Sequence, residues 1–148
     1  MNQTLPAIVA MLIGGAFLAL QAPTNAMLAR GAGSPVNAAM VSFLVGSVGL
    51  IVAALLLRAK PDPAVIRGLP WWVWLGGLYG AVLVAATAFA APRIGLASAL
   101  TLGVAAQLVV AVALDHFGLM GLAVKPIDLS KIAGLALVAV GVVLVRRG

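Results

Sequence analysis

The stretch that decides the class of this protein is AAQLVVAVALDHFG, residues 105–118. It is a long apolar run that contains one amide side chain and a carboxylate near its end. Residues spaced by four along this part of the chain share one helix ridge, and they are small or polar: Ala99, Gly103, Gln107, Ala111 and Asp115. Small residues let helix backbones approach closely, and polar groups are costly against lipid. The ridge therefore predicts an all-α membrane protein with a polar seam between its helices.

Composition indicates the same class. Of 148 residues, 64% are hydrophobic and 8% are charged, which leaves too little polar surface to cover a water-soluble core. The formal net charge is +6, but the Lys and Arg residues stand at the ends of apolar runs, where they set topology. We therefore expect the lipid bilayer, and not nucleic acid, as a partner. The chain has no Cys, one His and three acids, which argues against a metal site, and no cofactor is expected.

Five apolar segments are long enough to cross a bilayer, and together they form one expected transmembrane domain, residues 1–148. The expected helices are residues 5–29, 35–57, 71–91, 94–116 and 129–145. A signal peptide is the alternative for the first segment, but no Lys or Arg precedes its apolar core, so we expect a transmembrane helix. Within this helix, Pro23 predicts a kink or a local widening, because proline cannot donate to the carbonyl four residues earlier.

Short polar side chains mark the expected helix starts. Ser34 is a natural N-cap for the second helix, with a proline directly after it. Asp62 also precedes a proline and predicts the cap of a short interfacial helix. For the last helix, Asp128 and Ser130 are alternative caps.

Unusual residues stand at both ends of the expected third helix. All three tryptophans, Trp71, Trp72 and Trp74, cluster at its start, which is typical of an aromatic belt at the membrane interface. A ligand cage is the alternative, but residues so close in sequence point in different directions around a helix. At the other end, Pro92 and Arg93 predict a tight connection to the fourth helix.

Four polar side chains are candidate substrate-binding or coupling residues: Gln21, Asn25, Gln107 and Asp115. Gln21 and Asn25 are four residues apart, so they share a helix face that must point inward. The three amides can hydrogen-bond either a neighbouring helix or a polar substrate. Asp115 can serve proton or cation coupling, or a hydrogen bond at a helix end. We expect no catalytic residue, since Asp115 and its neighbour His116 face different directions on a helix.

Two glycine pairs are candidates for helix packing. Gly76 and Gly80 form a GxxxG motif in the third helix. Gly134 and Gly141 are one heptad apart in the fifth helix and form a stripe of small residues. This stripe suits packing against another helix, including the same helix of a second copy.

The distribution of cations gives the strongest inference, because five spans place the termini on opposite sides of the membrane. One side holds five cations: Arg58, Lys60, Arg67, Lys125 and Lys131. The other side holds four: Arg30, Arg93, Arg146 and Arg147. Five minus four is one, so the chain carries almost no orientation signal. We expect dual topology, with copies inserted both ways and paired as an antiparallel homodimer. The alternative is one orientation, fixed by a weak bias.

Several segments also carry a family resemblance. They are QAPTNAML at residues 21–28, AQ at 106–107, LDHFGL at 114–119, KIAGL at 131–135 and GVVL at 141–144. With these segments the chain resembles the YdcZ family of the bacterial drug/metabolite transporter superfamily, over nearly its full length. The resemblance implies a five-helix unit equal to half of a ten-helix inverted-repeat transporter, found as an antiparallel homodimer, a heterodimer with a homologous subunit or a fused duplicate. It also implies a prokaryotic inner membrane.

Three functions remain open. The first is a secondary transporter that exports a small metabolite or drug-like solute by alternating access. The others are a passive channel and a non-transporting membrane subunit that needs a partner. None of the spans has an acid at its middle, which favours a neutral, zwitterionic or anionic solute over a lipophilic cation. An enzyme is not expected.

Overall fold

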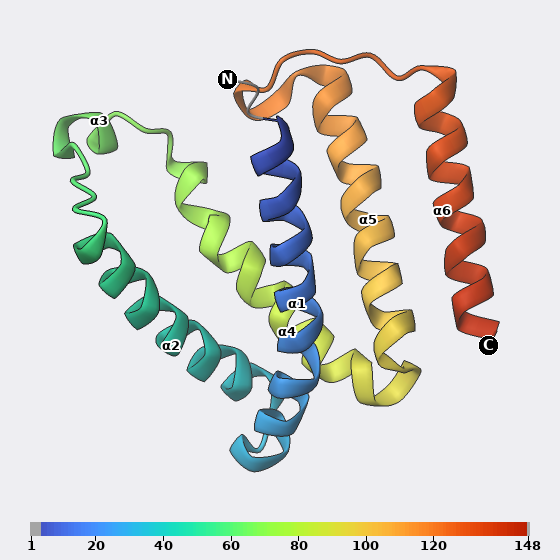
Figure 1. Ribbon diagram of the computed structural model, residues 1–148, viewed down its shortest axis with the longest axis horizontal. Coiled ribbons are helices and arrows are strands. Elements are labelled where there is room, and N and C mark those ends of the chain that lie inside the picture. The colour runs from blue at the N-terminus through green and yellow to red at the C-terminus, as the bar shows by residue number, and fades with distance from the viewer. Residues whose placement is uncertain (1–3, 148) are drawn as a thin grey trace. The chain divides into compact units, whose positions relative to one another are not determined.

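A computed structural model describes residues 4–147, and every regular element in them is a helix (Figure 1). The elements are α1 (Thr4–Ala32), α2 (Pro35–Leu56), α3 (Pro63–Arg67), the 3₁₀-helix η1 (Trp71–Leu75), α4 (Gly76–Ile94), α5 (Leu96–Phe117), the 3₁₀-helix η2 (Leu119–Gly121) and α6 (Leu129–Arg147). The described residues contain five helices that are long and apolar enough to cross a membrane. This confirms the expected all-α, five-span class.

The chain divides into two compact units, one up to Phe89 and one from Ala90 onward. The first unit contains α1, α2, α3, η1 and most of α4. The second unit contains the end of α4 together with α5, η2 and α6.

Most of the buried side chains in the first unit are those of alanine. Five alanines on three helices are less than 9% exposed: Ala22, Ala26, Ala38, Ala39 and Ala88. Large apolar side chains on the same helices point outward, among them Leu12, Leu50 and Val82. Such an arrangement would be unstable in water, but in a bilayer the outer Leu and Val side chains contact lipid and the alanines let the helices approach closely. The pattern of burial therefore fits a membrane environment.

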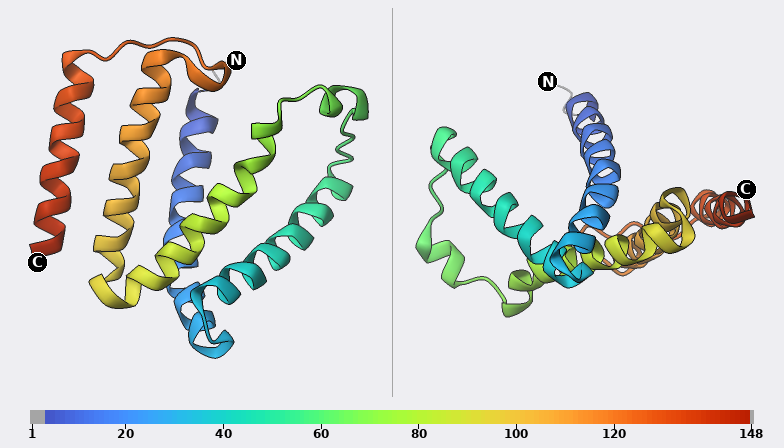
Figure 2. Two further views of the ribbon diagram at one scale, coloured as in Figure 1. Left: turned by 180° about the vertical axis from the view of Figure 1, so that it is seen from behind. Right: turned by 90° about the horizontal axis from the view of Figure 1, so that it is seen from below.

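The first two helices form a tight hairpin. Gly33 makes the turn with a φ of 82°, a left-handed conformation that favours glycine. Ser34 caps α2 as expected, because its hydroxyl oxygen accepts a hydrogen bond from the backbone N–H of Asn37 at 3.0 Å. From this turn α1 and α2 diverge, as both views in Figure 2 show. The candidate site lies between these two diverging helices.

Helix α1 continues through Pro23 without interruption. Its 29 residues would measure about 43 Å, more than the roughly 30 Å of the hydrocarbon core, so it must tilt, bend or project from the bilayer. Pro23 provides no N–H for the carbonyl of Ala19. One residue later, the Thr24 hydroxyl donates to the carbonyl of Leu20 at 2.9 Å. The helix bends along its length in Figure 2, as expected of a proline-containing helix.

Of the four candidate packing glycines, Gly80 alone lies close to another helix of the described chain. A Cβ atom added at Gly80 would lie 3.1 Å from the ring of Phe43 on α2, which is tighter than ordinary contact. At Gly76, Gly134 and Gly141 an added Cβ would meet nothing within 4 Å. The GxxxG motif of α4 therefore contributes one contact, and the two glycines of α6 leave an open surface.

We predict that Gly80→Val destabilises the protein and that Gly76→Val does not. The valine at position 80 would force Phe43 away from α4, and overpacking of this kind costs about 1–3 kcal/mol. The same change at Gly76 meets open space and should cost about 0.5 kcal/mol or less. Thermal unfolding in detergent, followed by far-UV circular dichroism, measures both. Equal losses of stability would contradict the α2–α4 contact.

The connection between α4 and α5 differs from the expectation. Pro92 and Arg93 lie inside the last turn of α4, which runs to Ile94, so they do not form the connection. Gly95 forms it instead, with φ 83° and ψ 148°. Only glycine adopts this conformation without strain, since it has no Cβ atom. Proline is tolerated in the last turn because its missing N–H removes a single hydrogen bond there.

The start of the third span also differs from the prediction. Trp71, Trp72 and Trp74 form the 3₁₀-helix η1 rather than the first turn of an α-helix. Residues three apart align in a 3₁₀-helix, so Trp71 and Trp74 share one side, and both are exposed. The prediction that the three tryptophans point in different directions is therefore wrong for Trp71 and Trp74.

In the second unit, α5 packs against α6, and the segment between them is tied to both helices. The backbone N–H of Lys125 donates to the carbonyl of Asp115 at 2.8 Å, and that of Ile127 donates to Nδ1 of His116 at 3.0 Å. Asp128 is the cap of α6, because its carboxylate accepts from the backbone N–H of Lys131 at 2.8 Å. The loop at this end of α5 is therefore held by backbone hydrogen bonds.

Candidate functional site

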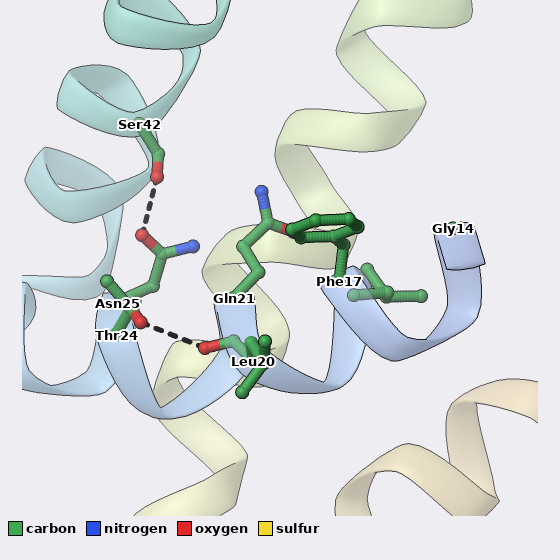
Figure 3. Close-up of a pocket in the computed structure, with 8 residues that line it drawn as sticks. Gly14, Phe17, Leu20, Gln21, Thr24, Asn25 and Ser42 are labelled. Atoms are coloured by element: carbon green, nitrogen blue, oxygen red, sulfur yellow. Dashed lines mark hydrogen bonds between the residues drawn. The ribbon is translucent and has the colours of Figure 1, made fainter.

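The candidate site is built around Asn25, the largest fully buried side chain of the described residues, which is 1% exposed. Its Oδ1 accepts a hydrogen bond from the hydroxyl of Ser42 on α2 at 2.6 Å (Figure 3). A buried amide without partners would cost a few kcal/mol, so this bond fixes the position of Asn25 between α1 and α2. The amide nitrogen remains a donor that the bond to Ser42 does not use.

Asn25 lines an open cleft with a volume of about 500 Å³. The cleft lies between α1 and α2, and its lining residues are Gly14, Phe17, Leu18, Leu20, Gln21, Thr24, Asn25 and Ser42. Figure 3 shows Phe17, Gln21 and Asn25 extending from the same side of α1. The volume falls in the range typical of small-molecule sites. Gln21 and Asn25 therefore share a face, and that face lines the cleft.

A second, much smaller gap lies on the α4 side of the same two amides. It has a volume of about 10 Å³, and its lining residues are Leu18, Gln21, Ala22, Asn25, Leu83, Val84 and Thr87. This volume is roughly that of one water molecule. The Thr87 hydroxyl donates to the carbonyl of Leu83 at 2.7 Å, so its oxygen keeps a free acceptor position. The amides thus stand where α1, α2 and α4 meet.

The chemistry of the cleft is polar and uncharged. Its eight lining residues, all within the described part of the chain, include amides, hydroxyls and apolar groups but no ionisable side chain. Amides donate and accept hydrogen bonds without a desolvated charge. Moving a bare ion into such a site would cost several kcal/mol, because no opposite charge compensates its lost hydration. The cleft can therefore orient a polar solute by hydrogen bonds but offers no counter-charge to an ion.

The other two candidate residues belong to α5, in the second unit. Gln107 lies along the body of this helix and is exposed, and so is Ala111 on the same ridge. The ridge was predicted to face a helix or a cavity; in the structure Ala99, Gly103 and Asp115 are half-buried, but Gln107 and Ala111 are exposed. Asp115 is half-buried in the last turn, and its backbone carbonyl accepts from Lys125 and Gly118. Asp115 therefore lies at the end of its helix and not at the middle.

Metal binding finds no support in the described residues. Within residues 4–147 no group of three or more His, Asp or Glu side chains lies close enough to hold a metal ion. Two of the three acids serve as helix caps, because Asp62 accepts from the N–H of Ala64 at 2.8 Å and Asp128 accepts from Lys131.

The hydrogen bond between Ser42 and Asn25 was not predicted, although the spacing of the two residues from the hairpin turn indicates it. Asn25 stands eight residues before Gly33, and Ser42 stands eight residues after Ser34. Residues equally far from a tight hairpin turn lie opposite each other in antiparallel helices. Phe17 and Thr24 were also missed, and both follow from the period of the helix once Gln21 is placed in the cleft.

Comparison with known proteins identifies the family of the chain. A family profile described as "Putative inner membrane exporter, YdcZ" matches residues 6–144, which include nearly all of the five long helices. No curated protein and no solved structure matches the chain. The family description and the five apolar helices together place the chain in the inner membrane as a multi-pass protein. The match confirms the resemblance seen in the sequence, and the chain belongs to the YdcZ family.

Proposed function

We propose that the chain exports a small solute without net charge, and that it does so as a dual-topology antiparallel homodimer working by alternating access. The family description supports export as the activity. The single observation that carries the solute class is the cleft at Asn25, which is polar, uncharged and large enough for a small molecule. Gln21 and Asn25 provide hydrogen bonds to the solute, and Phe17 provides an aromatic surface.

The absence of ionisable groups from the cleft lining supports the solute class. A cation would require a carboxylate in the cleft, and an anion would require Lys or Arg, but the lining residues include neither. A neutral or zwitterionic solute with both polar and apolar parts matches hydrogen-bonding amides beside Phe17, Leu18 and Leu20.

The antiparallel dimer is supported by the near equality of cations on the two sides, five against four. It is supported also by polar and small positions that the described chain leaves open. Gln107 is exposed on α5, and an amide against lipid is costly, so a second copy would supply its partner. Gly134 and Gly141 leave an open stripe on α6 that suits a helix of a second copy. Two copies with opposite orientations would provide the inverted symmetry on which many transporters depend.

We propose that Asp115 and Gln107, both on α5, take part in the same transport cycle. Asp115→Asn removes the acid of this helix while keeping the shape of the side chain. Loss of flux with retained solute binding would assign coupling to Asp115. Unchanged flux would remove the residue from the proposal and leave it as a helix-end group.

The proposal is tested in proteoliposomes with four probes that share an aromatic skeleton: benzamide, phenylalanine, benzylammonium and benzoate. The expected result is saturable uptake and counterflow of a probe without net charge, either benzamide or zwitterionic phenylalanine. Gln21→Leu should abolish this flux, because it removes an amide from the cleft at a half-buried position. Circular dichroism shows that the variant is folded.

Each other outcome contradicts a defined part of the proposal. Counterflow of benzylammonium or benzoate alone would reject the solute class. Flux that does not saturate would indicate a channel. No flux of any probe would favour a non-transporting subunit or a requirement for a heterologous partner.

A further inference from the structure

We propose that residues 57–74 form a binding surface for anionic phospholipid headgroups. This basic–tryptophan segment connects α2 to α4 and contains α3 and all but the last residue of η1. It combines three of the nine cations in the chain with all three of its tryptophans. The inference concerns the lipid surface and does not depend on the solute that the protein carries.

Three cations of this segment are exposed: Arg58, Lys60 and Arg67. The one acid among them, Asp62, is already engaged, because its carboxylate accepts from the backbone N–H of Ala64 at 2.8 Å. Three positive charges and one negative charge leave the segment with a net charge of +2. The cations are therefore available to a negatively charged partner.

Arg58 occupies a backbone position that usually belongs to glycine. Its φ is 51°, directly after the end of α2, and the next residue donates from its N–H to the carbonyl of Ala54 at 2.9 Å. This is the geometry in which glycine is preferred, and a side chain there adds backbone strain. An arginine at this place gains a favourable interaction with the helix C-terminus, and it also adds a cation to the exposed surface.

The tryptophans fix the depth of the segment in the membrane. Trp71 is 74% exposed and Trp74 is 62% exposed, and both lie on one side of η1. Tryptophan prefers the level of the lipid headgroups, where its ring meets acyl chains and its N–H meets polar groups. The cations that precede them in the chain then lie among the lipid phosphates. Val65 and Leu69 are also exposed, and their apolar side chains suit contact with the acyl chains below the headgroups.

Charge complementarity favours lipid over a second copy of the chain as the occupant. The chain has nine cations and three acids, and two of those acids are engaged as helix caps. A second copy therefore offers few acids against nine cations. Anionic phospholipids supply phosphate at the depth that the tryptophans define, and basic segments beside a membrane helix bind such surfaces.

The three tryptophans provide the probe for the test, because all of them lie in this segment. The protein is reconstituted in vesicles of one fixed composition of phosphatidylcholine and phosphatidylglycerol, with bromine carried either by the first lipid or by the second. Bromine quenches tryptophan fluorescence on contact. We expect bromophosphatidylglycerol to quench several-fold more per mole than bromophosphatidylcholine, since each cation can favour an anionic surface by roughly fivefold. The preference should weaken as salt is added.

The triple variant Arg58→Gln, Lys60→Gln and Arg67→Gln should reduce the ratio of the two quenching efficiencies to about one. The matched control removes three cations elsewhere with Arg30→Gln, Arg146→Gln and Arg147→Gln, and it should keep the preference. Equal quenching in the unaltered protein, or equal loss in both variants, would overturn the proposal. Competition by inorganic phosphate beyond that of chloride at equal ionic strength would also overturn it, since it would indicate a site for the free ion. If the triple variant fails to fold, the salt titration of the unaltered protein decides.

Discussion

Replacement of Asn25 by aspartate should be the most destabilising conservative change in the chain, lowering the free energy of unfolding by about 3–5 kcal/mol. Aspartate has nearly the same shape as asparagine, but it introduces a carboxylate at a position that is 1% exposed. The hydroxyl of Ser42 can donate only one hydrogen bond to it. No lining residue of the cleft provides a compensating cation. Reversible unfolding in mixed detergent micelles, followed by the helical circular dichroism signal, measures the change.

The matched control is Asn37→Asp, which makes the same chemical change at an exposed position in the first turn of α2. A negative charge is favoured at a helix N-terminus, although the hydrogen bond from the Asn37 amide to the carbonyl of Ala32 is lost. The net effect should be about 1 kcal/mol or less. If the two substitutions cost the same, Asn25 is not buried in the membrane and the cleft is not formed as described.

Cross-linking through α6 should distinguish antiparallel from parallel pairing of two copies. The chain lacks cysteine, so Gly134→Cys and Gly141→Cys introduce the only thiols. If the glycine stripes of two copies face each other in opposite directions, position 134 of one copy lies beside position 141 of its partner. Copies that carry different cysteines, expressed together, should then form the mixed disulfide.

The geometry makes the two pairing modes exclusive. Positions 134 and 141 are separated by about 10 Å along a helix, whereas a disulfide requires Cα atoms within about 7 Å. Each single variant expressed alone should therefore remain uncross-linked in an antiparallel pair. Cross-linking of each variant with itself, without the mixed product, would show a parallel pair. No cross-link of either kind would place the interface away from α6, and Gly46→Cys and Gly49→Cys would test α2, where the glycines are also open.

The helices and their starts were predictable from sequence because each depends on local chemistry. Apolar runs of about 20 residues identify membrane spans, and Ser34, Asp62 and Asp128 identify caps through their side-chain oxygens. The α4–α5 connection was not predictable in this way. Proline was read as the breaker, but the last turn of α4 accommodates Pro92, and the chain turns at Gly95, where a positive φ is required.

The candidate site could be predicted only in part. Spacing alone placed Gln21 and Asn25 on one face, because the period of a helix is fixed. The pairing of Ser42 with Asn25 depends on the position of the hairpin turn. That position sets the register of the two antiparallel helices, so it is a property of both helices together. The surroundings of Gln107 could not be predicted. A polar ridge in a membrane helix needs a partner, but the sequence does not state whether that partner is the same chain or a second copy.

The measurement that tests the central claim most directly is the orientation of the chain in the membrane. Single cysteines are introduced next to Met1 and at Gly148, and intact cells are labelled with a maleimide that cannot cross the membrane. Dual topology predicts that a substantial fraction of copies is labelled at each position, because the two sides of the chain carry five and four cations. Labelling at one position alone would show a single orientation. It would contradict the antiparallel homodimer and direct attention to an oppositely inserted partner subunit.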